Sequence, residues 1–87
     1  MAEPVKILIY SSPWCGYCAA AKSLLKEKDL QFEDIDVSTD KKVREEIIQR
    51  TGRRTVPQIF IDGESIGGFD ELHALNESGE LDKLLGQ

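Results

Sequence analysis

The amino-acid sequence predicts an α/β domain in which a four-stranded mixed sheet carries helices on both faces. At the start of the chain, a strand, a helix and a second strand follow one another within about thirty residues, which favours parallel strands joined by a crossover helix. Further on, two short apolar strands flank an Asp-Gly turn, which is typical of an antiparallel hairpin. The 87 residues suffice for one such domain, predicted over residues 1–87.

The first strand and the first helix follow from residue type and spacing. Residues 5–10 are mostly β-branched and aromatic and end at a Ser-Ser-Pro turn, which predicts a largely buried strand. Good helix formers then run from residue 16 to about residue 28. Cys18, Ala21 and Leu25 recur at spacings of three and four, so this face of the helix should turn toward the core.

A second strand is predicted over residues 31–37 and a second helix over residues 40–51. Ser38 or Thr39 is the expected N-cap of that helix, and Gly52 is the expected left-handed residue at its end. The inward-facing side chains are Val43, Ile47 and Ile48. With the first two elements, this order makes a βαβα unit.

The last part of the chain predicts a hairpin and two helical segments. Strands 58–61 and 64–67 flank the turn Asp62-Gly63, which tolerates the positive φ angles of a tight turn. Asp70 is the expected cap of a third helix, and a short helical turn should close the chain. The apolar residues of these two segments are Leu72, Leu75, Leu81, Leu84 and Leu85. The predicted order of elements over the whole chain is therefore βαβαββα, followed by a C-terminal helix.

Composition narrows the class of function. An apolar fraction of 40% with 31% charged residues is that of a soluble globular chain, and the longest aliphatic and aromatic run, Ile7 to Tyr10, is far too short to span a membrane. The net charge of -5 disfavours nucleic acid and anionic lipid as partners, although a local basic region could bind a small anion. The N-terminus lacks the pattern of a secretory signal, so a cytoplasmic location is expected.

The two cysteines, Cys15 and Cys18, are the candidate catalytic residues. Cys15 lies where the first strand passes into the first helix, and unpaired N–H groups and the helix dipole at that position favour a thiolate. A free thiol with a pKa near 8.5 would be only about 3% ionised at pH 7. Cys18 lies on the buried face and should keep a higher pKa. This asymmetry suits thiol-disulfide exchange, in which one thiolate attacks and the second thiol resolves the mixed disulfide.

A structural disulfide and a zinc site are the alternatives for this pair. A four-residue loop would gain only roughly 2 kcal/mol from cross-linking, against about 3 for a fifteen-residue loop, and a reducing compartment would not maintain it. Structural zinc needs four ligands, whereas Cys15, Cys18 and the distant His73 supply three at most. His73 is better interpreted as a solvated helix residue. The redox interpretation is therefore favoured, with no metal site predicted.

Three segments of the sequence resemble the signature segments of the glutaredoxin family, in matching order over nearly the whole chain. These segments are Cys15-Gly16-Tyr17-Cys18, Thr55-Val56-Pro57 and Gly67-Gly68-Phe69-Asp70. Trp14-Cys15-Gly16 is also similar to thioredoxins, but those carry proline where this chain has Tyr17 and lack the paired glycines. The resemblance implies a thioredoxin-like fold and glutathione as the reductant.

The resemblance also implies which residues bind glutathione, namely Tyr17, Arg53, Thr55, Val56, Pro57, Gly68, Phe69 and Asp70. Val56 precedes a proline and should be extended, so that its backbone pairs with the tripeptide like an added strand, and Pro57 is implied to be cis. The N–H groups of Phe69 and Asp70 suit the γ-glutamyl carboxylate, while the Asp70 carboxylate suits the ammonium. For the other carboxylate, Arg53 matches the family pattern better than Arg54.

The chain departs from the family pattern at three positions. Ser12 stands where many members have a lysine, so one expected contact is missing, and Arg53 is a candidate substitute. Gly16 stands where proline is common, and in this family such a change can accompany a glutathione-ligated [2Fe-2S] cluster. Phe69 stands where some relatives carry an additional cysteine, which excludes regulation through that thiol.

We therefore expect a glutathione-dependent thiol-disulfide oxidoreductase that reduces protein-glutathione mixed disulfides and protein disulfides, with Cys15 as nucleophile and Cys18 as resolving thiol. The partners are glutathione and the oxidised proteins, and the chain should be a monomer. The alternative is a protein that binds or transfers a [2Fe-2S] cluster as a homodimer, with Cys15 of each chain and two glutathione thiolates as ligands. A non-catalytic interaction domain is a third possibility.

Overall fold

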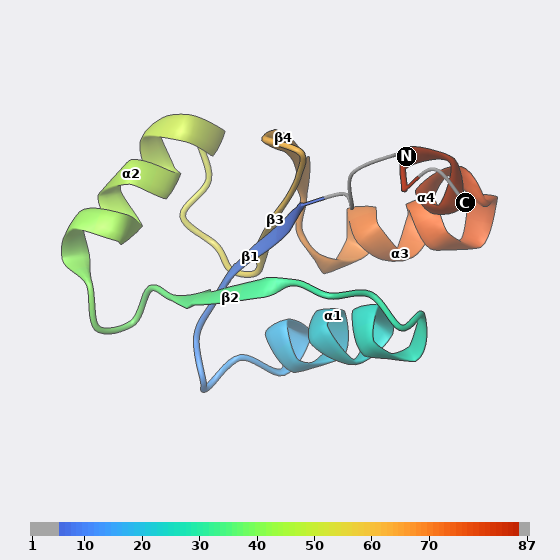
Figure 1. Ribbon diagram of the computed structural model, residues 1–87. Coiled ribbons are helices and arrows are strands. Elements are labelled where there is room, and N and C mark those ends of the chain that lie inside the picture. Colours follow the sequence, from blue (N-terminus) through green and yellow to red (C-terminus); the bar gives the residue numbers. More distant parts are fainter. Residues whose placement is uncertain (1–5, 86–87) are drawn as a thin grey trace.

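A computed structural model of the chain describes residues 6–85, which form the expected four-stranded mixed sheet with helices on both faces. The elements in chain order are β1 (Ile7–Ser11), α1 (Gly16–Glu27), β2 (Glu33–Asp36), α2 (Lys41–Thr51), β3 (Gln58–Ile61), β4 (Glu64–Gly67), α3 (Phe69–Ser78) and α4 (Glu80–Leu84). Figure 1 shows how they are arranged. Among residues 6–85, no helix has both the length and the apolar character that crossing a membrane requires.

The sheet has the strand order β2-β1-β3-β4. β1 and β2 are parallel, as the crossover through α1 requires, whereas β1 with β3 and β3 with β4 are antiparallel. The hairpin turn has positive φ at Asp62 (50°) and at Gly63 (84°), which is why Asp-Gly suits it. The central strands β1 and β3 are buried along most of their length. The carboxyl end of β1 leads into the candidate site, and the amino end of β3 follows it.

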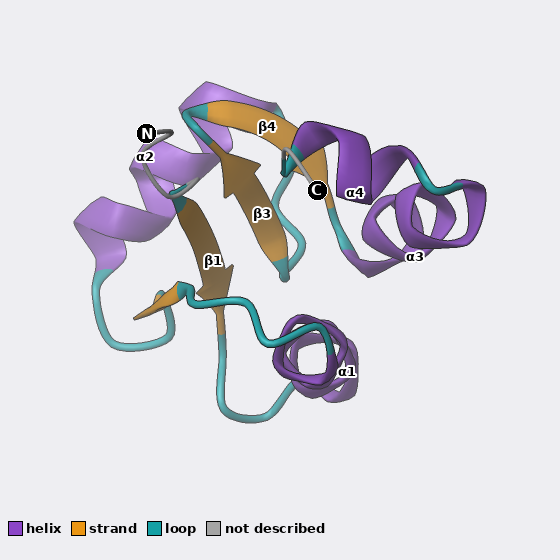
Figure 2. Ribbon diagram, turned by 45° about the vertical axis from the view of Figure 1, so that its right-hand side comes forward, coloured by secondary structure: helices purple, strands orange, loops and turns teal. Residues whose placement is uncertain are grey.

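Two apolar clusters cover the two faces of the sheet. Ile9 and Ile59 pack with α1, α3 and α4 on one face, whereas Tyr10 and Phe60 pack with α2 on the other. Figure 2 shows the sheet between these two layers. Alternate residues of β1 and β3 point to opposite faces, so each central strand contributes to both clusters. As predicted, Cys18, Ala21 and Leu25 form the buried face of α1. Leu84 is the exception among the C-terminal leucines because it remains exposed.

Strand bounds differ slightly from those predicted. β1 covers residues 7–11 instead of 5–10, and residue 5 lies outside the described part of the chain. Ser11 extends the strand because it pairs with Asp36 of β2. β2 is shorter than the predicted 31–37, since β1 offers it only the four partners from Leu8 to Ser11.

The predicted N-caps of two helices are wrong. The N-cap of α2 is Asp40, not Ser38 or Thr39, because the Asp40 carboxylate accepts hydrogen bonds from the N–H groups of Lys42 (3.0 Å) and Val43 (3.3 Å). The N-cap of α3 is Gly68, not Asp70. Asp70 lies in the first turn of α3, where its negative charge interacts favourably with the positive end of the helix dipole. Gly52 ends α2 in the left-handed conformation (φ 72°), as predicted.

Candidate active site

Cys15 is the N-cap of α1, at the end of the turn that follows β1. Its N–H bonds to the Ser12 carbonyl at 3.4 Å, and its Sγ accepts a hydrogen bond from the Cys18 N–H at 3.3 Å. The thiol form also donates to the Val56 carbonyl, 3.5 Å away on the loop before β3. The sulfur is thus held between a helix N-terminus and a segment 41 residues further along the chain.

The environment of Cys15 favours its thiolate. Partial burial on its own raises the pKa of this thiol, but hydrogen bonds from the Cys18 thiol and from the N–H groups of Cys18 and Tyr17 stabilise the negative charge. The balance lowers the pKa of Cys15 below its ordinary value. This is the direction predicted from its position at the helix start.

Cys18 is chemically different from Cys15 although it lies in the same helical turn. Its side chain is fully buried, and this burial, together with the neighbouring Cys15 sulfur, raises the pKa of Cys18 to about 11. Neither cysteine is in a disulfide bond. The thiol of Cys18 is close enough to hydrogen-bond Cys15. The pair therefore combines an accessible thiolate with a protonated thiol behind it.

A cavity of about 340 Å³ opens beside the loop that carries Val56. The residues around it are the eight that the sequence analysis selected, together with Glu71: Tyr17, Arg53, Thr55, Val56, Pro57, Gly68, Phe69, Asp70 and Glu71. They come from the start of α1, the α2–β3 loop and the start of α3. The Val56-Pro57 peptide bond is cis, as the resemblance implied. The structure thus brings the predicted residues together, and their role toward glutathione stays a prediction.

Close backbone contact at the start of α3 depends on Gly68. A Cβ added there would lie 3.1 Å from the Pro57 carbonyl oxygen, which is tighter than ordinary packing. With any larger residue at this position, α3 or the cis-proline loop would have to shift by a few tenths of an ångström. At the other side of that loop, the buried Gln58 side chain donates to the Thr55 carbonyl at 2.9 Å. This hydrogen bond joins the residues on either side of Val56-Pro57, in the loop that faces Cys15.

Glu71 is a cavity residue that the sequence analysis missed. Its carboxylate accepts from the Gly68 N–H at 3.3 Å and forms an ion pair with Arg53. The hydrogen bond from Arg53 lowers the pKa of Glu71 below its usual range. A Glu three residues after the cap of a helix is a recognisable capping pattern, but it becomes visible only once Gly68 is taken as the cap.

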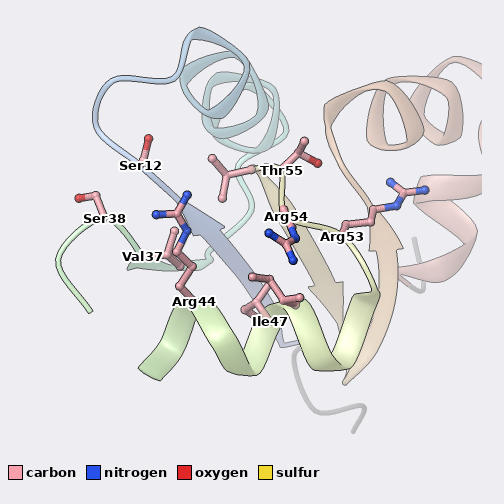
Figure 3. Close-up of a pocket in the computed structure, with 10 residues that line it drawn as sticks. Ser12, Val37, Ser38, Arg44, Ile47, Arg53, Arg54 and Thr55 are labelled. Atoms are coloured by element: carbon pink, nitrogen blue, oxygen red, sulfur yellow. The ribbon is translucent and has the colours of Figure 1, made fainter. Parts of the chain in front are cut away.

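A second cavity of about 190 Å³ lies on the other side of the same loop, between that loop and α2. Figure 3 shows Arg44 from α2 and Arg54 from the loop directing their guanidinium groups toward this space, while Arg53 points away toward α3. Ser12 also lines it, at the position where the family often has lysine. Arg44 was not considered in the sequence analysis. Its only indication in the sequence is the high share of basic residues in and after α2.

The fold and this cysteine arrangement together define a class. Exchange chemistry needs an accessible thiolate with a protonated thiol behind it, and here both are supplied by the first turn of a helix that packs on a thioredoxin-like sheet. The protein is therefore of the thiol-disulfide oxidoreductase class with a thioredoxin-like fold.

Comparison with known proteins gives the family within that class. The family model described as Glutaredoxin matches residues 7–66. Glutaredoxin 3 of Escherichia coli is 49% identical over 77 residues, covering 88% of this chain and 93% of the relative. The solution structure of glutaredoxin from Brucella melitensis is 46% identical with a TM-score of 0.86, covering 97% of this chain and 91% of the other. A crystal structure of a buckwheat glutaredoxin-glutathione complex is 30% identical with a TM-score of 0.87, covering 92% and 76%. The chain belongs to the glutaredoxin family.

Proposed function

We propose that the protein is a glutathione-dependent thiol-disulfide oxidoreductase that removes glutathione from protein mixed disulfides. The observation that carries this proposal is the Cys15 sulfur, held at a helix N-cap by the Cys18 N–H and facing the Val56 carbonyl. The Cys15 thiolate attacks the glutathionyl sulfur, a disulfide forms between Cys15 and glutathione, and the protein leaves as a thiolate that takes a proton from solvent. A second glutathione thiolate then attacks that glutathione sulfur, so glutathione disulfide leaves and the Cys15 thiolate is restored.

Glutathione would lie in an extended conformation in the 340 Å³ cavity, which is lined by Val56, the residue whose carbonyl faces Cys15. The Val56 N–H and C=O would pair with its backbone, as in an added strand. The N–H groups of Phe69 and Asp70 at the start of α3 would donate hydrogen bonds to the γ-glutamyl carboxylate. The Asp70 carboxylate would bind the ammonium group of the same γ-glutamyl residue. Tyr17, Thr55, Pro57 and Gly68 would form the walls. The buckwheat relative, whose structure is that of a glutathione complex, supports this assignment.

Arginines are the proposed partners of the glycyl carboxylate. Arg53 lines both cavities, but it is paired with Glu71, so it would exchange that carboxylate for the one on the ligand. Arg54 and Arg44 face the second cavity without an ion pair in the described part of the chain. They would compensate for the missing lysine at Ser12.

Cys18 adds a second route for protein disulfides. After Cys15 has formed a mixed disulfide with a protein, Cys18 would lose its proton to the departing protein thiolate as its sulfur attacks Cys15. The protein leaves as a thiol, and two glutathione molecules reduce the resulting Cys15–Cys18 disulfide and leave as glutathione disulfide. The high pKa of Cys18 keeps it protonated until this step. A reduction potential of about -200 to -230 mV is expected. We place this reaction in the cytoplasm, where the glutathione pool is reducing.

Two single substitutions test the assigned roles. Release of glutathione from a glutathionylated protein is measured with excess reduced glutathione. Cys15→Ser should abolish the reaction, because no nucleophile remains, whereas Cys18→Ser should retain it and lose most of the activity toward protein disulfides. An active Cys15→Ser variant, or a Cys18→Ser variant as inactive as Cys15→Ser, would contradict the proposal.

A [2Fe-2S] cluster shared by two chains is the second candidate function, favoured by Gly16. Glycine leaves open space beside Cys15, since a Cβ added there would meet nothing within 4 Å. Within residues 6–85, no group of three or more potential metal ligands occurs, so a cluster would require Cys15 from two chains and two glutathione thiols. Anaerobic purification with glutathione, iron and sulfide tests this idea. A colourless monomer would eliminate it. If the wild type is a coloured dimer, the Gly16→Pro variant should lose the colour and the dimer.

A further inference from the structure

Trp14 is a large apolar side chain that the fold does not use. It is the only tryptophan in the chain, it is 88% exposed, and it directly precedes Cys15. Neither cavity beside the active-site loop is lined by Trp14, and it belongs to neither apolar cluster of the described residues. A single exposed aromatic residue is unremarkable on a protein surface. Its significance here comes from its neighbour in the chain.

Bond formation at Cys15 restricts where a protein substrate lies. A disulfide bond of about 2.05 Å would join Cys15 to the substrate cysteine, and consecutive Cα atoms lie about 3.8 Å apart in both chains. The residues that flank the substrate cysteine must therefore lie within reach of the residues that flank Cys15. On the α3 side, Tyr17 packs against Phe69 with ring centroids 6.1 Å apart, and both line the proposed glutathione cavity. Trp14 is the flanking side chain left free.

We propose that Trp14 is a docking surface for protein disulfides and packs against an apolar residue next to the reacting cysteine of the substrate. Tryptophan offers a large contact area at low entropic cost and is enriched among the residues that dominate interface energies. An apolar side chain suits the exposed indole ring because their contact removes apolar surface of both residues from water. The inference rests on the proposed function, because it requires exchange at Cys15, and adds a preference among protein substrates.

The reaction that would reveal this preference needs no glutathione. The Cys15 thiolate attacks one sulfur of a symmetric peptide disulfide, a Cys15–peptide disulfide forms, and the second peptide leaves as a thiolate that takes a proton from solvent. With glutathione absent, no glutathione molecule competes with the peptide for the surface around Cys15. A difference between the peptides that depends on Trp14 then reports on contacts with that side chain.

The experiment compares two symmetric disulfides of capped peptides, Gly-Leu-Cys-Leu-Gly and Gly-Ser-Cys-Ser-Gly. The second-order rate constant with the reduced full-length chain is measured from the released peptide thiol and divided by that for free glutathione as nucleophile, which removes intrinsic reactivity. We expect the leucine peptide to react about tenfold faster, since burial of part of a leucine side chain is worth about 1.4 kcal/mol. Trp14→Ser should bring the ratio close to one.

Leu84→Ser is the matched control. Leu84 is also an exposed apolar residue, at 43%, but lies on α4, so its removal should leave the ratio unchanged. A wild-type ratio near one, or a ratio that persists in Trp14→Ser, would overturn the docking role. Glutathione disulfide, tested in parallel, separates this failure from that of the proposed function: a chain that reacts with it and shows no peptide preference loses only the docking role, and one that reacts with none of the disulfides loses both.

Discussion

Cys15 and Cys18 are the same residue type within one helical turn, yet their pKa values shift in opposite directions. The cause is position: Cys15 caps the helix and accepts hydrogen bonds from N–H groups, while Cys18 lies on the buried face of α1 with Ala21 and Leu25. Spacing in the sequence was sufficient to predict this difference. It could not predict the contact between Cys15 and the Val56 carbonyl, because nothing in the residues between them specifies that approach.

Alkylation by iodoacetamide as a function of pH tests this asymmetry. Only thiolates react, so the rate at Cys15 should reach half its maximum at a pH below the ordinary pKa of a thiol, while Cys18 should react only as the pH approaches about 11. Peptide mapping by mass spectrometry assigns each rate. Prior treatment with glutathione disulfide should protect Cys15. Equal profiles for the two cysteines, or a Cys15 no more reactive at neutral pH than a free thiol, would favour a non-catalytic interaction domain.

Substitution of single arginines tests the proposed glycyl-carboxylate contacts. Arg53→Ala and Arg54→Ala should each raise the KM for glutathione by up to about tenfold, because an interaction with a charged group contributes about 1.5 kcal/mol. Arg50→Ala is the control, since Arg50 lies over the Phe60 ring, 4.5 Å from its centroid, and lines neither cavity. If all three variants have the same KM as the wild type, the carboxylate lies elsewhere.

At the scale of elements, the sequence predicted every strand and helix but misplaced two caps. Element type follows from the periodicity of many residues, so one ambiguous position changes little. An N-cap depends on the backbone conformation of one residue, and the three consecutive residues Ser38, Thr39 and Asp40 are all of types that favour an N-cap. The predicted site segments were brought together for the same reason: each lies at an element boundary, and the topology places these boundaries at one end of the sheet.

The cap of α2 can be verified by its effect on stability. Asp40→Ala should lower the free energy of unfolding by about 1 kcal/mol and the Tm by about 4–8 °C, because two N–H groups of the first turn lose their acceptor. Thr39→Ala removes the neighbouring candidate and should change stability by less than about 0.5 kcal/mol. Thermal unfolding followed by circular dichroism measures both. A larger loss for Thr39→Ala would restore the cap that the sequence favoured.

At the scale of the whole molecule, charge is distributed unevenly. The chain has a net charge of -5, but Lys41, Lys42, Arg44, Arg50, Arg53 and Arg54 place six of its eleven basic side chains in α2 and the loop after it. This basic side borders both cavities next to Cys15. An acidic surface that disfavours polyanions thus coexists with a local site suited to a small anion such as glutathione.

The stability of the whole fold should also depend on Cys18 at alkaline pH. Cys18 is buried in the folded chain with a pKa of about 11, whereas an ordinary thiol has a pKa of about 8.5. Between these values the unfolded chain loses a proton that the folded chain keeps. The unfolded state then binds fewer protons, and the free energy of unfolding falls as the pH rises from about 8.5 toward about 11. Urea unfolding of the reduced protein at several alkaline pH values measures this slope. Cys18→Ala removes the titrating group and should flatten the slope. Both proteins are compared in a Cys15→Ser background, because the Cys18 thiol hydrogen-bonds Cys15 and therefore influences its titration. Identical slopes in the two proteins would show that the Cys18 thiol is not held protonated by the core, and the resolving role proposed for it would lose its physical basis.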